Sequence, residues 1–214
     1  MFWKKNRIKI YSENDMKLIE NHISTSFGEV NKVFHEIVSP DIHVDICWIA
    51  PSPERNYHTL VTMGMGAHRM TMPKELRKST LDRAELIVTL PPDWDVENSD
   101  EQFYWPLRWL KMLARLPVIN KTWLGYGHTV QMADPLPKTP TLCSAMISMP
   151  YFFGNESATC NLSNGSYVNF YQIIPLYEDE MSFKLANDAE ALENLFPDDF
   201  DMVVNIARKS VIAN

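Results

Sequence analysis

The sequence predicts an α+β fold in which a mixed, largely antiparallel β-sheet is flanked by helices. Two apolar runs, residues 42–49 and 58–66, are separated by a charged loop that contains two prolines. Because proline cannot donate a hydrogen bond within a sheet, we expect these runs to be neighbouring strands joined at the surface. Two long segments, 101–116 and 178–196, repeat apolar residues at helical spacing and are predicted to cover the sheet.

The first part of the chain is predicted to add a helix and further strands to this hairpin. Residues 13–27 place apolar side chains on one helical face, and Gly28 follows where a left-handed cap is favourable. Residues 29–38 alternate apolar and polar side chains, as a strand does, and the short links predict antiparallel pairing. Residues 72–78 predict a short helix or turn, and 83–90 predict the next strand.

The second part of the chain is predicted to complete the sheet and its helical cover. Pro117 should end the helix at 101–116, because proline lacks a backbone donor, and Asn164-Gly165 suits a hairpin turn. The remaining predicted elements are a glycine-rich link to a short strand at 123–130, a proline-rich loop at 134–141, strands at 143–149 and 168–175, and a helix at 200–211. We expect one domain over residues 1–214, with its core at about 13–196 and a helical extension at 197–214.

Composition and charge narrow the class of protein. A net charge of −7 and a pI near 5.4 argue against nucleic-acid binding, which usually requires a clustered basic face. The three cysteines form no Cys-x-x-Cys pair, which indicates reduced thiols. The basic N-terminal residues are followed by no apolar stretch typical of a signal peptide or membrane span. We therefore expect a soluble, cytoplasmic protein with no nucleic-acid or membrane partner, and its oligomeric state stays open.

Polar side chains on the predicted hairpin form one candidate site. His43 and Asp45 share a face of their strand, and His58 lies on the next strand. Together with His35 and Glu36 one strand earlier, these imidazoles and carboxylates could supply ligands for zinc or iron. The spacing matches neither HExxH nor a paired HxH, however, and buried polar groups usually bond one another. We interpret His43 and Asp45 as a structural polar pair. A metal-binding domain or metal-dependent enzyme that uses His43, Asp45 and His58 is the alternative.

Other short motifs are interpreted as structural. Residues 64–68 (GMGAH) lack the lysine and the helix pattern of a phosphate loop, so we expect a tight backbone turn there. Cys143 beside Ser144, or Cys47 near His58, would in principle suit nucleophilic catalysis. A cysteine within a strand is far more often a small apolar side chain. The sequence therefore predicts no catalytic residue, no metal and no cofactor.

Acidic residues gather in the loop at 93–101 and again at 178–180. A solvated surface is the simpler interpretation of both clusters. The functional interpretation is an electrostatic landing patch for a cationic protein, which would speed association and help to select the partner.

A series of stretches carries a resemblance to a known family, and they occur in order over residues 27–196. They are 42–46 (IHVDI), 51–55, 57–65 (YHTLVTMGM), 83–86, 90–94 (LPPDW), 105–115, 122–129 (TWLGYGHT) and 170–177. Together they resemble the bacterial suppressor-of-fused domain family. The resemblance implies an α+β sandwich with a mixed sheet flanked by helices, in agreement with the patterns above.

The same resemblance implies protein binding as the function. The animal relative sequesters a transcription factor by holding an extended peptide between two domains, and this chain is too short for the second domain. Bacterial members are regarded as immunity proteins, which neutralise a toxin by binding it. We expect a non-enzymatic immunity protein whose partner is a basic toxin domain. A regulatory adaptor that sequesters a transcription factor is a further alternative.

Partner contact is predicted at the acidic loop and at a dipeptide where the chain departs from the usual continuation of the family. The predicted partner-binding residues are Asp93, Trp94, Asp95, Glu97, Glu101, His68 and Arg69.

Overall fold

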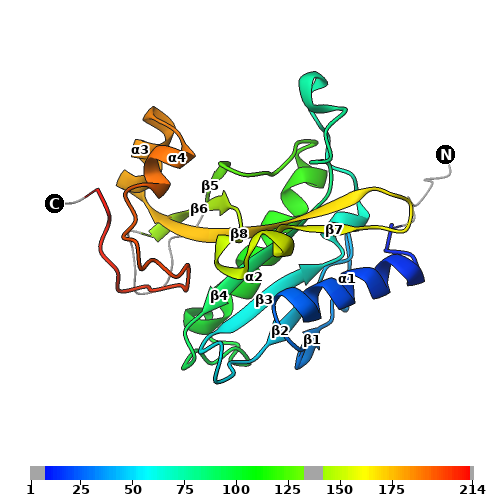
Figure 1. Cartoon of the computed structure of the whole chain (residues 1–214), viewed down its shortest axis with the longest axis horizontal. Helices are drawn as coiled ribbons and strands as arrows, with labels where there is room; N and C mark the ends of the chain where they lie inside the picture. The colour runs from blue at the N-terminus through cyan, green and yellow to red at the C-terminus, as the bar shows by residue number, and fades with distance from the viewer. Residues whose placement is uncertain (1–7, 133–141, 213–214) are drawn as a thin grey trace.

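The computed structural model describes residues 8–132 and 142–212, and these form an open mixed sheet with helices on both faces (Figure 1). The strands are β1 (Lys32–Phe34), β2 (Asp45–Ile49), β3 (His58–Met63), β4 (Ala84–Leu90), β5 (Thr129–Gln131), β6 (Leu142–Ser148), β7 (Thr159–Asn161) and β8 (Tyr167–Tyr177). The helices are α1 (Glu13–Ser26), α2 (Glu101–Ile119), α3 (Glu178–Ala186) and α4 (Ala189–Glu193).

Within the described residues the strand order is β1-β2-β3-β4-β8-β6-β5, and β7 also pairs with β8. Strands β1 to β4 form an antiparallel meander, in which Cys47 lies opposite Val61 and Val61 lies opposite Ile87. The β4–β8 ladder is parallel, and the other ladders of β8 are antiparallel. The predicted α+β class with a mixed, largely antiparallel sheet is therefore confirmed.

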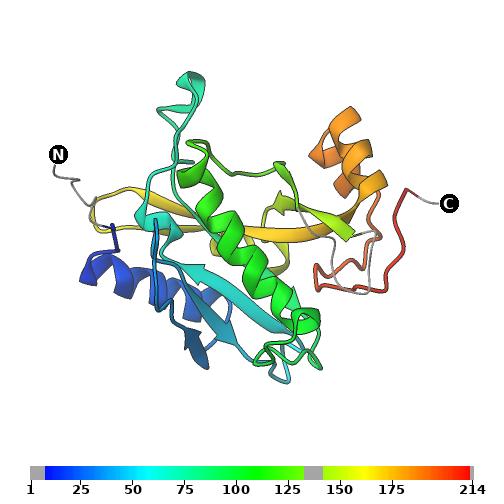
Figure 2. The same cartoon turned by 180° about the vertical axis from the view of Figure 1, so that it is seen from behind.

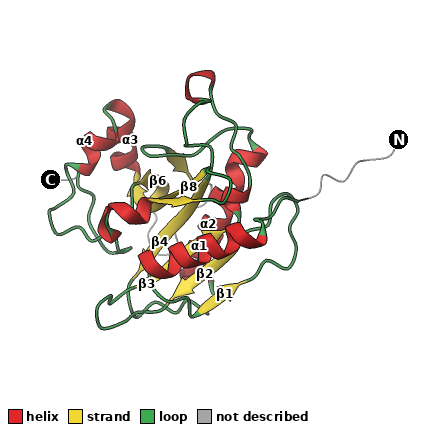
Figure 3. Cartoon of the chain, turned by 45° about the vertical axis from the view of Figure 1, so that its right-hand side comes forward, coloured by secondary structure: helices red, strands yellow, loops and turns green. Residues whose placement is uncertain are grey.

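Two helices cover opposite faces of the sheet, as the front and back views show (Figures 1 and 2). Helix α2 buries Trp105 and Trp109 in the larger core, against the face that includes Leu60 of β3. Helix α1 buries Ile19 and Ile23 against the other face in a second core. Figure 3 shows both helices with the strands between them. This three-layer arrangement follows from strands whose two faces are both apolar.

A third apolar cluster lies on the α1 face of the sheet, at the far end of β8. It joins Met146 of β6 and Ile174 of β8 to Leu192 of α4. The chain after α4, residues 197–212, returns across this cluster, and we call it the C-terminal strap. Val203 forms a parallel bridge with Thr89 of β4, and the Val204 N–H donates to the Thr89 carbonyl at 2.9 Å.

The C-terminal strap corrects the predicted helix at 200–211, because this segment contains no helix. The Asp201 side chain accepts from the Val203 N–H, and Asn205 accepts from the Ala207 N–H. Such local bonds give the backbone an alternative to the helical pattern. The helical extension predicted for 197–214 is therefore wrong over its described residues.

Two helix boundaries also differ from the prediction. Pro117 lies inside α2, because it removes a single donor while the next bonds continue from the Asn120 N–H to the Leu116 carbonyl. The helix predicted over 178–196 is divided into α3 and α4. Asp188 caps the second piece, since its side chain accepts from the Ala191 N–H at 2.8 Å.

The strand predicted over 29–38 is only three residues long, and the next one begins at Asp45. Between these two strands, side-chain carboxylates accept the backbone N–H groups in place of strand partners. The Glu36 N–H donates to the Asp45 carboxylate, and the Val44 N–H donates to the Glu36 carboxylate. Strand β7 was not predicted, β8 extends past the predicted 168–175, and the loop predicted at 134–141 lies outside the described residues. In residues 8–132 and 142–212, no helix combines the length and apolar character needed to cross a bilayer.

Candidate functional site

The structure places Trp94, one of the predicted contact residues, in the core. Its side chain is only 8% exposed, its indole N–H donates to the Phe103 carbonyl at 3.0 Å, and its ring meets those of Phe103 and Trp105 edge to face. Its role is therefore to fix the loop at 93–101 on α2, and a partner reaches little of its surface.

The acidic side chains of this loop are exposed, but two of them already have basic partners. Glu97 pairs with Lys32 of β1, and Glu101 pairs with Arg108, seven residues later in α2. Asp93 and Asp95 are exposed and form no ion pair within the described part of the chain. The net negative charge available to a partner is therefore smaller than the sequence indicates.

His68 and Arg69 are held by the chain itself and lie away from the acidic loop. His68 Nε2 lies 3.0 Å from the Lys9 carbonyl oxygen, and Arg69 Nε lies 3.4 Å from Asp82. They follow the end of β3, whereas the loop at 93–101 follows β4, which runs antiparallel to it. The structure therefore does not bring the two predicted groups together.

The polar pair on the hairpin is formed, although His58 is not part of it. Asp45 lies 3.1 Å from Nε2 of His43 and 3.0 Å from Nδ1 of His35. His58 lies at the other end of the β2–β3 ladder, where its Nδ1 accepts the indole N–H of Trp48 at 2.9 Å. Within the described ranges no cluster of three His, Cys, Asp or Glu side chains could hold a metal ion. The geometry thus does not assemble the alternative site of His43, Asp45 and His58.

The thiols are poorly suited to nucleophilic catalysis. Burial raises the pKa of the Cys47 thiol to about 12, with smaller contributions from nearby carboxylates such as Glu85. Burial, followed by the charge of Glu178, raises the pKa of Cys143. Nucleophilic attack requires the thiolate, which neither cysteine forms readily near neutral pH.

The glycine motif at 64–68 binds an internal carboxylate, which the sequence did not indicate. The N–H groups of Gly64 and Gly66 donate to Glu85 Oε1 at 2.9 and 3.0 Å, and the hydroxyls of Tyr11 and Thr62 also donate to this carboxylate. Gly64 has φ +129°, and a Cβ there would lie 2.3 Å from the His43 carbonyl oxygen. The predicted tight turn is therefore an anion-binding loop whose ligand is the chain's own Glu85.

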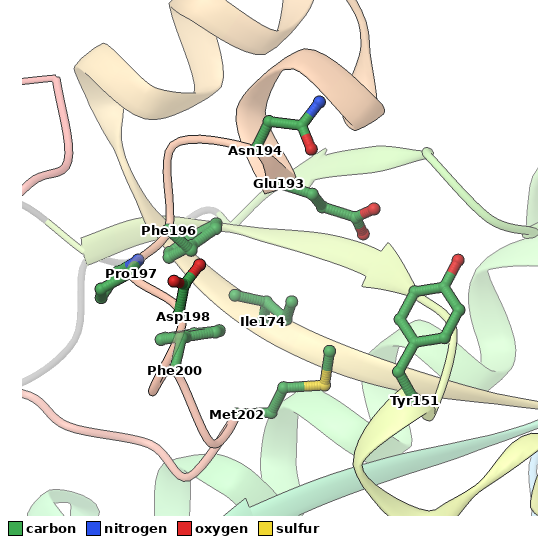
Figure 4. Close-up of a pocket in the computed structure, with 9 residues that line it drawn as sticks. All are labelled: Tyr151, Ile174, Glu193, Asn194, Phe196, Pro197, Asp198, Phe200 and Met202. Carbon is green, nitrogen blue, oxygen red and sulfur yellow. The ribbon is translucent and has the colours of Figure 1, made fainter.

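The strongest candidate site in the described residues is an open groove of about 320 Å³ between α4, the C-terminal strap and the sheet (Figure 4). We call it the α4 groove. Ile174 of β8 lies at its floor, and Tyr151, from a short 3₁₀ turn after β6, faces Glu193 of α4 across it. Its further lining residues include Phe196, Asp198, Phe200 and Met202.

The aromatic side of the α4 groove is built by local structure. The rings of Phe196 and Phe200 stack with centroids 4.2 Å apart. Met202 has φ +58°, a left-handed conformation that is unfavourable for a side chain, and its carbonyl accepts the Thr89 hydroxyl at 2.7 Å. Backbone strain of this kind often occurs at binding sites.

The charged side of the α4 groove lacks a counterion. Glu193 accepts the hydroxyls of Ser148 at 2.5 Å and Tyr126 at 2.8 Å, both of which are neutral donors. Neither Glu193 nor Asp198 forms an ion pair within residues 8–132 and 142–212, and no basic side chain lines the groove. Burial first, and then the charge of Glu193, raises the pKa of Tyr151. The groove therefore carries a negative potential.

An aromatic ridge extends the surface beyond the groove. Tyr151 and Phe152 are 55% and 42% exposed, and the Phe152 ring lies 5.1 Å from that of Tyr57. Tyr57 lines a second hollow of about 540 Å³ on the other side of the C-terminal strap, where Trp94 and Ile206 also contribute. Large apolar side chains exposed together often mark a protein interface.

The sequence contained a signal for this ridge. Residues 151–153 read Tyr-Phe-Phe directly after Pro150, outside any helical or alternating pattern that would bury them. Phe153 packs against Phe27 in the second core, so the exposed aromatic surface is that of Tyr151 and Phe152.

An ion pair fixes the C-terminal strap beside the groove. Arg208 donates to both carboxylate oxygens of Glu180 in α3, at 2.5 and 2.6 Å, and also to the Pro175 carbonyl at 2.8 Å. Glu180 is fully buried, and the guanidinium lies 4.8 Å over the ring of Tyr177 and 5.5 Å over that of Phe196. This arrangement positions the segment that forms one side of the groove.

Sequence and structure comparisons find proteins that are similar to this chain over nearly its whole length. An uncharacterized protein of Ureaplasma parvum serovar 3 is 26% identical over 205 residues, which cover 94% of this chain and 98% of that protein. A suppressor-of-fused homologue from Neisseria gonorrhoeae FA 1090 has a TM-score of 0.66 at 19% identity, over 95% of this chain and all of the other.

Two further solved structures share the fold. A chain of the Sufu-Fu complex has a TM-score of 0.67 at 15% identity and covers 94% of both chains. Drosophila Suppressor of Fused has a TM-score of 0.66 at 16% identity, over 93% of this chain and 51% of that one. The model of the family described as Suppressor of fused protein (SUFU) matches residues 40–209, which is most of the chain. The chain therefore belongs to the suppressor of fused protein (SUFU) family.

Proposed function

We propose that this chain is a non-enzymatic, cytoplasmic immunity protein that binds a toxin domain and covers its active surface. The observation that carries the proposal is the α4 groove with its aromatic ridge, where exposed aromatic side chains adjoin carboxylates without a counterion. The Sufu-Fu complex supports protein binding as the mode of action, because there a protein of the same fold was crystallised with a protein partner.

The mechanism follows from the division of roles between aromatic and acidic residues. A few aromatic anchors buried on binding supply most of the free energy of association. Tyr151, Phe152 and Tyr57 are placed for that role, since each keeps part of its ring accessible. Exposed carboxylates such as Asp93 and Asp95 would mainly speed the approach of a basic partner.

A growth assay tests this function. A candidate toxin domain encoded by a neighbouring gene is expressed alone, with the wild-type chain, or with a Tyr151→Ala/Phe152→Ala variant. We expect the wild type to restore growth and the variant to do so poorly, because both rings are exposed and their truncation should leave the fold intact. A Tyr167→Ala variant, at an exposed position on β8, is the matched control.

The opposing result is equally clear. If the wild type restores no growth, or its purified neighbour-encoded partner is a regulator of transcription, the immunity proposal fails. If the double variant neutralises the toxin as well as the wild type does, the proposed immunity function stands, but the contact surface lies elsewhere on the chain.

A further inference from the structure

The chemistry of the α4 groove identifies the kind of side chain that a partner would insert. We propose that the groove binds an arginine side chain of a protein partner, flanked by apolar residues. This inference rests on the proposed function for the existence of the partner, and it adds the chemical class of the group that is recognised.

The Glu193 carboxylate has unused hydrogen-bonding capacity. An ionised carboxylate offers about four lone-pair sites, and the described residues use two of them, for the hydroxyls of Ser148 and Tyr126. Both donors are neutral, so the negative charge remains. Figure 4 shows the carboxylate directed into the groove toward Tyr151. A cation placed there would gain charge-assisted hydrogen bonds at a partly buried site.

Aromatic rings line the groove that contains this carboxylate. The stacked rings of Phe196 and Phe200 and the ring of Tyr151 line the same groove. A guanidinium is planar, stacks on aromatic rings and presents a fork of donors that matches a carboxylate, whereas an ammonium group is strongly hydrated and lacks that shape. Aromatic rings beside a carboxylate therefore favour arginine over lysine.

The chain fills an equivalent arrangement nearby with its own arginine. Arg208 pairs with the buried Glu180 and lies over the rings of Tyr177 and Phe196. Phe196 also lines the α4 groove, which repeats the combination of a carboxylate and aromatic rings. No basic side chain of residues 8–132 and 142–212 lines it, so within that part of the chain its carboxylates have no cation, and an arginine of a partner would supply one.

The size of the groove agrees with a side chain as the bound group. A volume of about 320 Å³ is near the lower end of the range for small-molecule pockets, about 300–1,000 Å³. The floor at Ile174 and the thioether of Met202 are apolar and suit the methylene groups of arginine and an adjacent apolar residue. Asp198 at the exposed rim would attract the cation from solution.

The test uses defined peptides, so it does not require the natural partner. A library of random heptapeptides is selected by display against the wild-type chain. We expect the bound peptides to be enriched in arginine next to apolar residues. The best peptide is then synthesised with arginine, with lysine and with citrulline, which keeps the shape of arginine and removes its charge, and each is titrated by calorimetry.

We expect at least a tenfold weaker affinity for citrulline than for arginine, an intermediate affinity for lysine, and a weaker affinity at high salt. Glu193→Gln should remove the difference between the arginine and citrulline peptides, while Glu190→Gln, on the same helix but outside the groove, should preserve it. Tyr151→Ala is a second variant that leaves the bonds of Glu193 in place, and it should weaken binding of the arginine peptide.

Several outcomes would overturn the inference. These are a selection that yields no peptide, peptides without a basic residue, or equal affinities for arginine and citrulline. Retention of the difference in Glu193→Gln would also overturn it, because the cation would then bind elsewhere. A toxin neutralised without these residues would refute the inference and leave the proposed function standing. Arginine-dependent peptide binding by a chain that neutralises no toxin would support the inference and refute the proposed function.

Discussion

The ion pair between Arg208 and Glu180 makes a quantitative prediction about the C-terminal strap. In an Arg208→Ala variant the fully buried Glu180 would lose both charge-assisted bonds and keep only the backbone N–H groups of Tyr177 and Val211 as donors. Removing one partner of a buried pair costs about 3–5 kcal/mol. Because the Arg208 side chain is 14% exposed and two donors remain, we expect about 3 kcal/mol.

The measurement is urea denaturation followed by tryptophan fluorescence, with the free energy of unfolding compared at constant slope. For a chain of this length each 1 kcal/mol corresponds to roughly 2–4 °C, so thermal unfolding should shift downward by about 6–12 °C. Lys209→Ala is the matched control, since its exposed neighbour position predicts a change within about 0.5 kcal/mol.

A second substitution separates the buried charge from the loss of packing. Adding Glu180→Gln to Arg208→Ala should recover about 1 kcal/mol or more, because the uncompensated charge disappears. The reasoning is refuted if Arg208→Ala lowers stability by less than about 1 kcal/mol, or if the two substitutions are simply additive.

Three other predictions follow from buried groups. Trp94→Ala should lower the free energy of unfolding by about 3–5 kcal/mol, while Asp95→Asn should change it by less than about 0.5, and thermal denaturation of both variants checks this. Gly64→Ala should lower the unfolding temperature markedly, because its φ is +129° and the new methyl would meet the His43 carbonyl; an unchanged temperature would contradict that geometry. Burial raises the pKa of Glu85 above 4.5 despite four hydrogen bonds that lower it, so the folded chain binds this proton more tightly than the unfolded chain. The free energy of unfolding should therefore fall as the pH rises from about 4.5 through the raised pKa. Over that pH range the stability of Glu85→Gln relative to the wild type should increase, and urea titrations at successive pH values measure this difference.

The sheet could be predicted because its strands carry local patterns. Residues 45–49 and 58–63 are flanked by turns and show the apolar runs that a buried strand needs, and α1 shows clear helical spacing. The pattern does not show where side chains replace backbone partners. Asp188 begins a new helix, and Asp201 holds the C-terminal strap out of helical form, although both positions are compatible with helical spacing.

The candidate site was harder to predict because it is formed by distant segments. Trp94 and the acidic residues near it looked available in sequence, yet tertiary contacts bury the indole and neutralise Glu97. The α4 groove joins β8, α4, the turn at Tyr151 and the C-terminal strap, so no single stretch shows it. The predicted contact role of His68 and Arg69 stays a prediction, and it concerns a different surface.

The parallel ladder between β4 and β8 has a consequence for synthesis of the chain. Strands β2, β3 and β4 can pair as soon as each leaves the ribosome, but the outer edge of β4 must wait until a long stretch containing α2 and β6 has been translated. All seven residues of β4 are buried in the finished fold, so during that interval the nascent chain displays an apolar strand edge to its neighbours. We expect the yield on rapid overexpression to be limited by association at this edge, and to improve when translation is slowed or the temperature is lowered.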